Sequence, residues 1–215
     1  MPTQELHEAV QSALAGRRLL DHPYYQAWQD GALTEADIAR YAGQYRHFEQ
    51  ALPDVLAATA GQIDDPATRR LVEANLADET SAPAHLDLFD RFAAALGATR
   101  PEPAGPGAAA LVDTYRQAVA SGPEAALAVI AAYEVQAADI AATKGAALRR
   151  HLSAGPDATQ FWDVHAGIEA AHARWTVEAL DALAAAPGPV RSWARASADA
   201  WWAFLDEQLE TLAPA

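Results

Sequence analysis

The stretch FWDVHAGIEAAHARW, residues 161–175, decides how this chain is built. His165, Glu169 and His172 stand at positions i, i+4 and i+7, so at about 100° per residue they share one face of an α-helix. The alanines and Gly167 around them are small and let neighbouring helices approach closely. Each of the three residues alone is typical of an ordinary polar surface. Together they predict a helix that offers three metal ligands to the interior of a bundle.

The sequence on both sides of this stretch favours helices throughout. Ala, Leu, Glu and Arg are abundant, and β-branched residues nowhere alternate with polar ones over a strand-length stretch. Capping signals, such as Thr34 with Asp37 and Asp65 before Pro66, mark helix starts. We therefore predict an all-α fold, a bundle of seven helices. They cover residues 34–50, a helix with Pro53 in its first turn, 66–79, 85–96, 123–151, 157–186 capped by Asp157, and 187–212.

The loop at residues 100–107 holds three prolines and two glycines but is too short to separate domains, so a single domain spanning 1–215 is expected. Fifteen Lys and Arg residues against 29 Asp and Glu give a net charge of −14, which argues against nucleic acid and anionic membranes as partners. No export signal is visible near the N-terminus, and the apolar run 125–133 is too short to span a bilayer. A cytoplasmic protein is expected.

The chain has no cysteine, which excludes disulfides, iron–sulfur clusters and cysteine nucleophiles. Three further side chains can complete the metal site: Glu79 at the end of one helix, His85 at the start of the next, and Glu134 after an apolar run where a lone carboxylate would be costly. Six ligands of oxygen and nitrogen suit two iron or manganese ions with open positions. Glu169-x-x-His172 matches the element of ferritin-like bundles, whereas the Glu79–His85 spacing does not.

With these residues in place, the chain resembles the haem-oxygenase-like dimetal oxidases and oxygenases, related in fold to the thiaminase and pyrroloquinoline-quinone synthase C groups. The matching pattern is Asn75-Leu-Ala-Asp-Glu79, His85, Tyr133-Glu134 and His165-x3-Glu169-x2-His172. The spacing between Glu79 and His85 leaves Asp78 as an alternative ligand. Glu169 stands where some relatives have Asp.

Two further segments resemble one branch of that family, named for the chlamydial protein associating with death domains. They are Leu20-Asp-His-Pro-Tyr-Tyr25-Gln-Ala-Trp28 and Tyr41-x3-Tyr45, together with Lys144 ten residues after Glu134. Members of the branch are para-aminobenzoate synthases that consume their own side chains. The resemblance implies that Tyr25 supplies the ring and Lys144 the nitrogen. It also implies two transition metals, Fe/Fe or Mn/Fe, with O2 as co-substrate and an external reductant.

Two alternatives remain open at this point. The same ligands would serve a dimetal oxygenase acting on an external small amine, amino acid or fatty acid. The second alternative is a non-catalytic helical interaction protein in which His165, Glu169 and His172 are a remnant without function. A thiaminase-type hydrolase is disfavoured because it needs a cysteine. Dimers are common in such scaffolds, so a homodimer is one expectation.

Several ionisable residues lie outside the six-ligand pattern. Glu49 is a candidate for a supporting carboxylate or a seventh ligand. Asp163 and Arg174 flank the metal helix and are expected to orient the imidazoles. His22 and His47 are expected to be structural.

Overall fold

Capping residues and prolines set where the helices of this protein begin. The computed structural model describes residues 2–98 and 102–212, and every regular element in those residues is helical. Thr34 and Asp37 form the predicted capping box, and the Asp65 side chain accepts from the amide of Thr68. The elements are α1 (Pro2–Ala13), η1 (Leu19–Asp21), α2 (Pro23–Gln29), α3 (Glu35–Gly61), α4 (Pro66–Thr80), α5 (His85–Ala95), α6 (Pro106–Ser121), α7 (Pro123–Leu152), α8 (Pro156–Ala182) and α9 (Pro187–Glu210).

The described residues thus hold nine α-helices, and the predicted count of seven is wrong. Pro53 lies inside α3, which continues past it although Pro53 cannot donate to the carbonyl of Glu49. Helices α1, α2 and α6 were not predicted; Pro106, assigned to the loop, occupies the first turn of α6. Gly155, not Asp157, is the N-cap of α8. The predicted loop at 100–107 lies partly outside the described residues.

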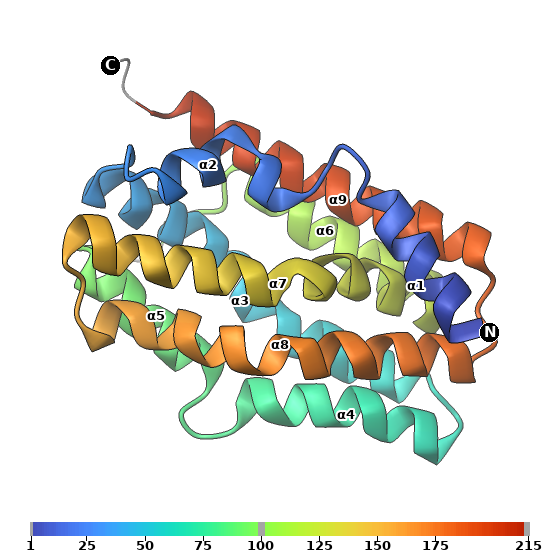
Figure 1. The fold of residues 1–215 in the computed structure, drawn as a ribbon. Coiled ribbons are helices and arrows are strands. Elements are labelled where there is room, and N and C mark those ends of the chain that lie inside the picture. The colour runs from blue at the N-terminus through green and yellow to red at the C-terminus, as the bar shows by residue number, and fades with distance from the viewer. Residues whose placement is uncertain (1, 99–101, 213–215) are drawn as a thin grey trace.

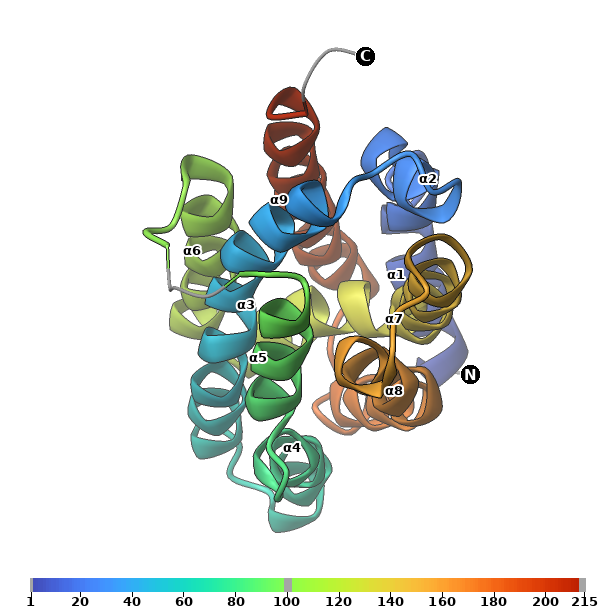
Figure 2. The same ribbon diagram turned by 90° about the vertical axis from the view of Figure 1, so that its left-hand side faces the viewer.

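Helices α7 and α8 pack side by side along the middle of the molecule (Figure 1). The end-on view places α3 and α5 across from them, with α9 on one side of the bundle and α4 on the other (Figure 2). Between these helices lies a core rich in aromatic side chains, including Tyr41, Tyr45, Phe89, Trp162 and Trp201. The residues singled out by the sequence lie along this interior.

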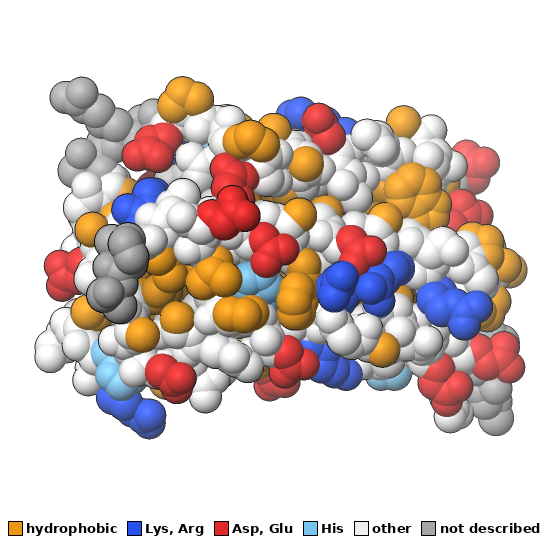
Figure 3. All heavy atoms as spheres, turned by 90° about the horizontal axis from the view of Figure 1, so that it is seen from above, with side chains coloured by type: hydrophobic (Ala, Val, Ile, Leu, Met, Phe, Trp, Pro, Cys, Tyr) orange, Lys and Arg blue, Asp and Glu red, His pale blue; other side chains and the backbone are white. Residues whose placement is uncertain are grey.

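Helix α7 is the most apolar element of the bundle. By length and composition alone it could cross a membrane, but 78% of its apolar window is buried inside the protein. A buried core helix of a soluble protein passes the same test. On the face seen from above, acidic and basic side chains are interspersed with hydrophobic ones (Figure 3).

Candidate active site

A buried cavity lies between α3, α4, α6, α7 and α8, and five of the six predicted ligands line it. Its wall is formed by Phe48, Glu49, Leu52, Glu79, Tyr115, Ile130, Tyr133, Glu134, His165, Glu169 and His172. The sixth, His85, lies against this group, and its ring centroid is 4.5 Å from that of His165. Ligand atoms of Glu79, His85 and His165 lie within 4.8 Å of one another. All six predicted ligands are buried.

The three residues of α8 present their side chains to the cavity as the helical spacing predicts. His165 donates from Nδ1 to the carbonyl of Phe161 at 2.8 Å, which leaves Nε2 directed at Glu169 Oε1, 3.9 Å away. His172 Nε2 donates to Asp78 Oδ2 at 3.2 Å, so its Nδ1 is the nitrogen that faces the carboxylates of Glu79 and Glu169. Each imidazole therefore has one nitrogen fixed outside the cavity and one available inside it.

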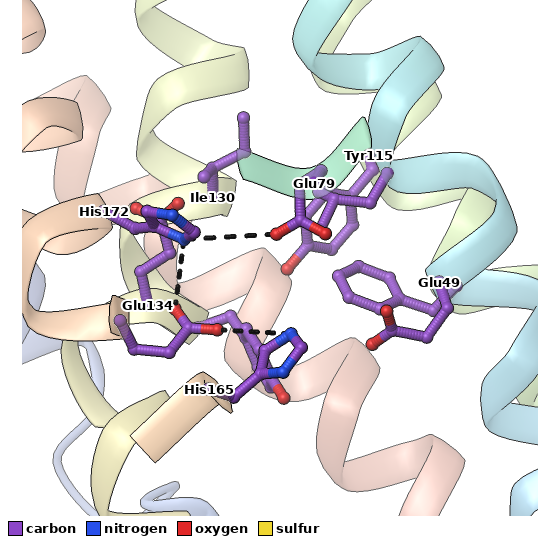
Figure 4. A pocket seen from close by; sticks show the side chains of 11 residues that line it. Glu49, Glu79, Tyr115, Ile130, Glu134, His165 and His172 are labelled. Carbon is purple, nitrogen blue, oxygen red and sulfur yellow. Dashed lines mark ion pairs between the residues drawn. The ribbon is translucent and has the colours of Figure 1, made fainter. Parts of the chain in front are cut away.

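The choice between Asp78 and Glu79 follows from their positions at the end of α4. Glu79 is buried, and its Oε2 accepts from His85 Nδ1 at 2.8 Å. Its other oxygen lies 4.0 Å from His172 Nδ1, an ion pair drawn in Figure 4. The Asp78 side chain is 44% exposed and touches His172 from the outside. Glu79 thus faces the other predicted ligands from inside the bundle, whereas Asp78 contacts His172 from the outside.

Glu134 on α7 is held from both sides by polar side chains that the sequence did not single out as partners. Asn75 Nδ2 donates to Oε1 at 2.5 Å, and Thr176 Oγ1 donates to Oε2 at 2.6 Å. Burial and the charge of Glu169 raise the pKa of Glu134 to about 7. Burial lowers the pKa of His172, but the neighbouring carboxylates, Glu169 foremost, outweigh it and raise that pKa to about 9.

The donor set fits a transition-metal site. Glu169 Oε2 is a buried oxygen without a hydrogen-bond partner among the described residues, which is costly unless a cation satisfies it. Burial, together with the charges of Glu79 and Glu169, holds the pKa of Glu49 well above its usual range. Carboxylate oxygens and imidazole nitrogens are ligands that iron and manganese accept. Bound cations would relieve the repulsion among these carboxylates.

The second predicted pair, Tyr25 and Lys144, is brought together in the core although the residues lie on α2 and α7. Lys144 Nζ donates to the hydroxyl of Tyr25 at 2.8 Å and to that of Tyr41 at 2.7 Å. The two hydroxyls are themselves 2.7 Å apart. All three side chains are buried. The lysine therefore leans back along α7 toward the aromatic core, as side chains on helices do.

Aromatic rings enclose the Lys144 amine. Nζ lies between 4.1 and 5.3 Å from the ring centroids of Tyr25, Trp28, Tyr41, Tyr45 and Trp162. Among the described residues no carboxylate lies within ion-pair distance of it. Burial consequently lowers the pKa of Lys144 well below its ordinary value. This environment favours a neutral amine.

A row of tyrosines joins the cavity to the Tyr25–Lys144 pair. Tyr133 lines the cavity next to Glu134, and its hydroxyl is 2.6 Å from that of Tyr45. The rings of Tyr45 and Tyr41 follow with centroids 5.3 Å apart, and Tyr41 contacts Tyr25. On α3, Tyr41, Tyr45 and Glu49 recur every four residues, a spacing that places them on one face. That spacing was the available signal for these residues.

Two predicted supporting residues do not reach the imidazoles. Asp163 forms an ion pair with Arg149, and Arg174 lies 3.6 Å from Glu178, all on the outer surface of the bundle. The prediction that they orient the histidines is wrong, because both point away from the ligand face of α8. His22 is fully buried and caps α2, which agrees with a structural role. His47 contacts the backbone carbonyl of Glu102 at 2.8 Å.

Comparison with known proteins adds family information to this geometry. A family model described as iron-containing redox enzyme matches residues 39–202. A 4-aminobenzoate synthase of Nitrosomonas europaea is 33% identical, over 96% of this chain and 92% of that protein. A 4-aminobenzoate synthase of Chlamydia pneumoniae is 27% identical, over 96% of both chains.

Solved structures share the fold at lower identity. A TenA homologue from Pseudomonas syringae pv. tomato has a TM-score of 0.79 at 18% identity, covering 96% of this chain and 92% of that one. A CADD-like protein of unknown function from Nostoc punctiforme also has a TM-score of 0.79 at 18% identity, covering 97% of each chain. These similarities agree with the expected haem-oxygenase-like helical bundle.

Proposed function

Because the chain belongs to the family of iron-containing redox enzymes with a haem-oxygenase-like fold, we propose that it is a self-sacrificing 4-aminobenzoate synthase. In this reaction the ring of Tyr25 becomes the product and Lys144 provides the amino nitrogen. Family membership makes the chain a redox enzyme and removes the alternative of a non-catalytic interaction protein. The curated relatives, which carry the name 4-aminobenzoate synthase, support the choice of product.

The observation that carries this proposal is the 2.8 Å contact between Lys144 Nζ and the Tyr25 hydroxyl. In 4-aminobenzoate the amino group stands on the ring carbon para to the carboxylate. That carbon corresponds to the one that bears the hydroxyl of a tyrosine, and the carboxylate carbon corresponds to Cβ. The lysine nitrogen thus lies close to the carbon it must join, and burial, which lowers the pKa of Lys144, favours the neutral amine with a lone pair available.

Metals would be held by the six predicted ligands, Glu79, His85, Glu134, His165, Glu169 and His172. Two ions, Fe/Fe or Mn/Fe, would supply oxidising power from O2 and an external reductant. The ligands would be oriented by hydrogen bonds from outside the cavity. His172 is held by Asp78, His165 by the carbonyl of Phe161, and Glu134 by Asn75 and Thr176. Tyr133, Tyr45 and Tyr41 provide a continuous set of contacts from the cavity wall to Tyr25. Burial of Tyr25 and Lys144 excludes water from the reacting atoms.

The test is a reaction without any added aromatic substrate. Metal-loaded, reduced protein exposed to O2 should release 4-aminobenzoate, at no more than about one equivalent per chain because the reagents cannot be replaced by diffusion. Protein labelled with ¹⁵N-lysine should give ¹⁵N-labelled product. Repeated turnover of an added amine, amino acid or fatty acid, without 4-aminobenzoate, would instead establish the oxygenase that uses an external substrate.

A further inference from the structure

Glu49 is the one carboxylate of the cavity wall, among the described residues, that the six-ligand assignment leaves unused. It lies on α3, is 4% exposed, and lines the cavity together with Glu79, Glu134 and Glu169. No lysine, arginine or histidine of the described residues comes within ion-pair distance of its carboxylate. A buried carboxylate without a positive partner is expensive to keep in its charged form.

The charge of Lys144 acts on Glu49 over a distance, but the contacts of its amine are made elsewhere. Its amine donates to the hydroxyls of Tyr25 and Tyr41 and is surrounded by aromatic rings. Glu49 therefore faces the cavity without a protein cation to neutralise it. In Figure 4 its carboxylate points into the cavity from α3, on the side opposite the histidines of α8.

The charge balance of the cavity identifies what Glu49 can bind. With neutral histidines, the six assigned ligands contribute three negative charges, from Glu79, Glu134 and Glu169. Two divalent cations would then leave one net positive charge buried in the protein. Adding the Glu49 carboxylate brings the centre to neutrality, which lowers the cost of burying it.

We propose that Glu49 is a seventh protein ligand of the dimetal centre and the ligand that α3 contributes. The inference rests on the metal centre of the proposed function, but it concerns binding of the metals and not the identity of the product. It places α3, which also carries Tyr41 and Tyr45, in direct contact with the metals. The centre would then draw ligands from α3, α4, α5, α7 and α8.

Metal titration of the whole chain tests this assignment. Wild-type protein, Glu49→Gln and the surface control Glu73→Gln are titrated with Mn²⁺, with binding followed by calorimetry and by the electron paramagnetic resonance of free Mn²⁺. Wild type and Glu73→Gln should bind two ions with the same affinities. Glu49→Gln should bind the more weakly held ion at least about tenfold less tightly, the loss typical when support of a metal is removed. Its metal-free melting temperature should be no lower than that of wild type, because a buried carboxylate is replaced by a neutral amide.

Unchanged affinity of both ions in Glu49→Gln would overturn the proposal while leaving the metal centre intact. Wild-type protein that binds no Mn²⁺ would overturn the centre itself, and the proposed function with it. If Glu49→Gln does not fold, the crystal structure of Mn²⁺-loaded wild type decides. A Glu49 oxygen within about 2.0–2.3 Å of a metal supports ligation, and one beyond about 3.5 Å excludes it.

Discussion

The amine of Lys144 ends among aromatic rings, in hydrogen-bond contact with the hydroxyls of Tyr25 and Tyr41. Sequence alone pointed to Tyr25 and Lys144 only through resemblance to a family, since neither residue carries a signal of its own. Helical spacing placed Lys144 away from Glu134, and only a side chain that leans back can bring it to the core. The contact between Tyr25 and Lys144 depends on the packing of α2 against α7, which no local sequence pattern predicts.

Tyr25 can be tested against its neighbour Tyr24, which is equally buried. Tyr25→Phe should keep its metals but yield no 4-aminobenzoate, because the ring then lacks the hydroxyl beside the lysine amine. Tyr24→Phe should still form product, since the Tyr24 hydroxyl contacts the carbonyl of Asp37 instead. Product and bound metal are measured in parallel by mass spectrometry and elemental analysis. Equal product yield from Tyr25→Phe and wild type would refute Tyr25 as the ring source.

Lys144 gives a prediction about stability as a function of pH. Burial lowers its pKa in the folded chain, whereas the unfolded chain keeps a value of about 10.4. Between these two values the unfolded chain binds the extra proton, so stability contributed by this site rises with pH and reaches its full value above about 10.4. Denaturant unfolding at roughly pH 8 to 10 should show wild type gaining stability relative to Lys144→Met. Parallel profiles for the two proteins would mean that Lys144 stays charged in the fold.

Helix α2 is short, and contacts at both of its ends hold Tyr25 in register with Lys144. At its start, His22 Nδ1 accepts from the amide of Tyr24, and Nε2 lies 3.1 Å from Asp206 on α9. Beyond its end, Gly31 adopts a φ of +72°, and the imidazole of His151 from α7 packs against it. His151 Nε2 also donates to the carbonyl of Gln29 at 3.2 Å.

Substitution of Gly31 should therefore disturb this anchor. Gly31→Ala should destabilise the protein by more than Gly16→Ala, because both glycines have positive φ but only at Gly31 would the methyl group overlap the His151 ring. The backbone strain shared by the two variants is about 1–2 kcal/mol. Gly31→Ala should also reduce the yield of 4-aminobenzoate at unchanged metal content, by displacing α2. Equal stability of the two variants in urea unfolding would contradict this account.

At the scale of elements, local signals predicted the caps of α3 and α4 and the ligand face of α8, because these depend on neighbouring residues only. They failed at Pro53, where the sequence indicates a new helix and the chain continues one helix. Tertiary packing of α3 against α4, α5 and α6 outweighs the lost hydrogen bond there. The four-residue spacing of Tyr41, Tyr45 and Glu49 on α3 can be read from the sequence. Aromatic residues at helical spacing more often belong to the core than to a site, so the spacing alone did not identify them.

The six predicted metal ligands lie on helices that are distant in sequence, so bringing them together depends on the fold of the whole molecule. Glu134 on α7 receives hydrogen bonds from Asn75 on α4 and Thr176 on α8, and His172 on α8 contacts Asp78 on α4. Sequence spacing and the family resemblance predicted the ligands but could not identify these partners, because each partner lies on a different helix from the residue it touches. Metal binding at these residues should also depend on pH, because protonated ligands must lose their protons before they bind a cation.

Binding of metals should release protons at pH 7. In the metal-free protein the pKa of His172 is about 9 and that of Glu134 about 7, so His172 is protonated and Glu134 is about half protonated. Both must lose their protons to bind a cation, so Mn²⁺ affinity should rise from pH 6 to pH 8. Calorimetric titrations in buffers of different ionisation enthalpy should show proton release of about one or more per chain at pH 7. Binding heats that do not depend on the buffer would contradict the assigned ligands.

The side chain of Tyr25 is 2% exposed and packs against the ring of Tyr41, so the proposed loss of this ring would also limit the lifetime of the protein. A chain that has given up this ring keeps a hole at the centre of its fold, and loss of a buried aromatic side chain costs about 3–5 kcal/mol. That is a large fraction of the roughly 5–15 kcal/mol that holds a typical domain folded. Spent chains would then unfold more often and be cleared by proteases before fresh ones. The supply of product in the cell would then follow the rate at which new chains are translated, and chains that have reacted would be degraded because they are less stable.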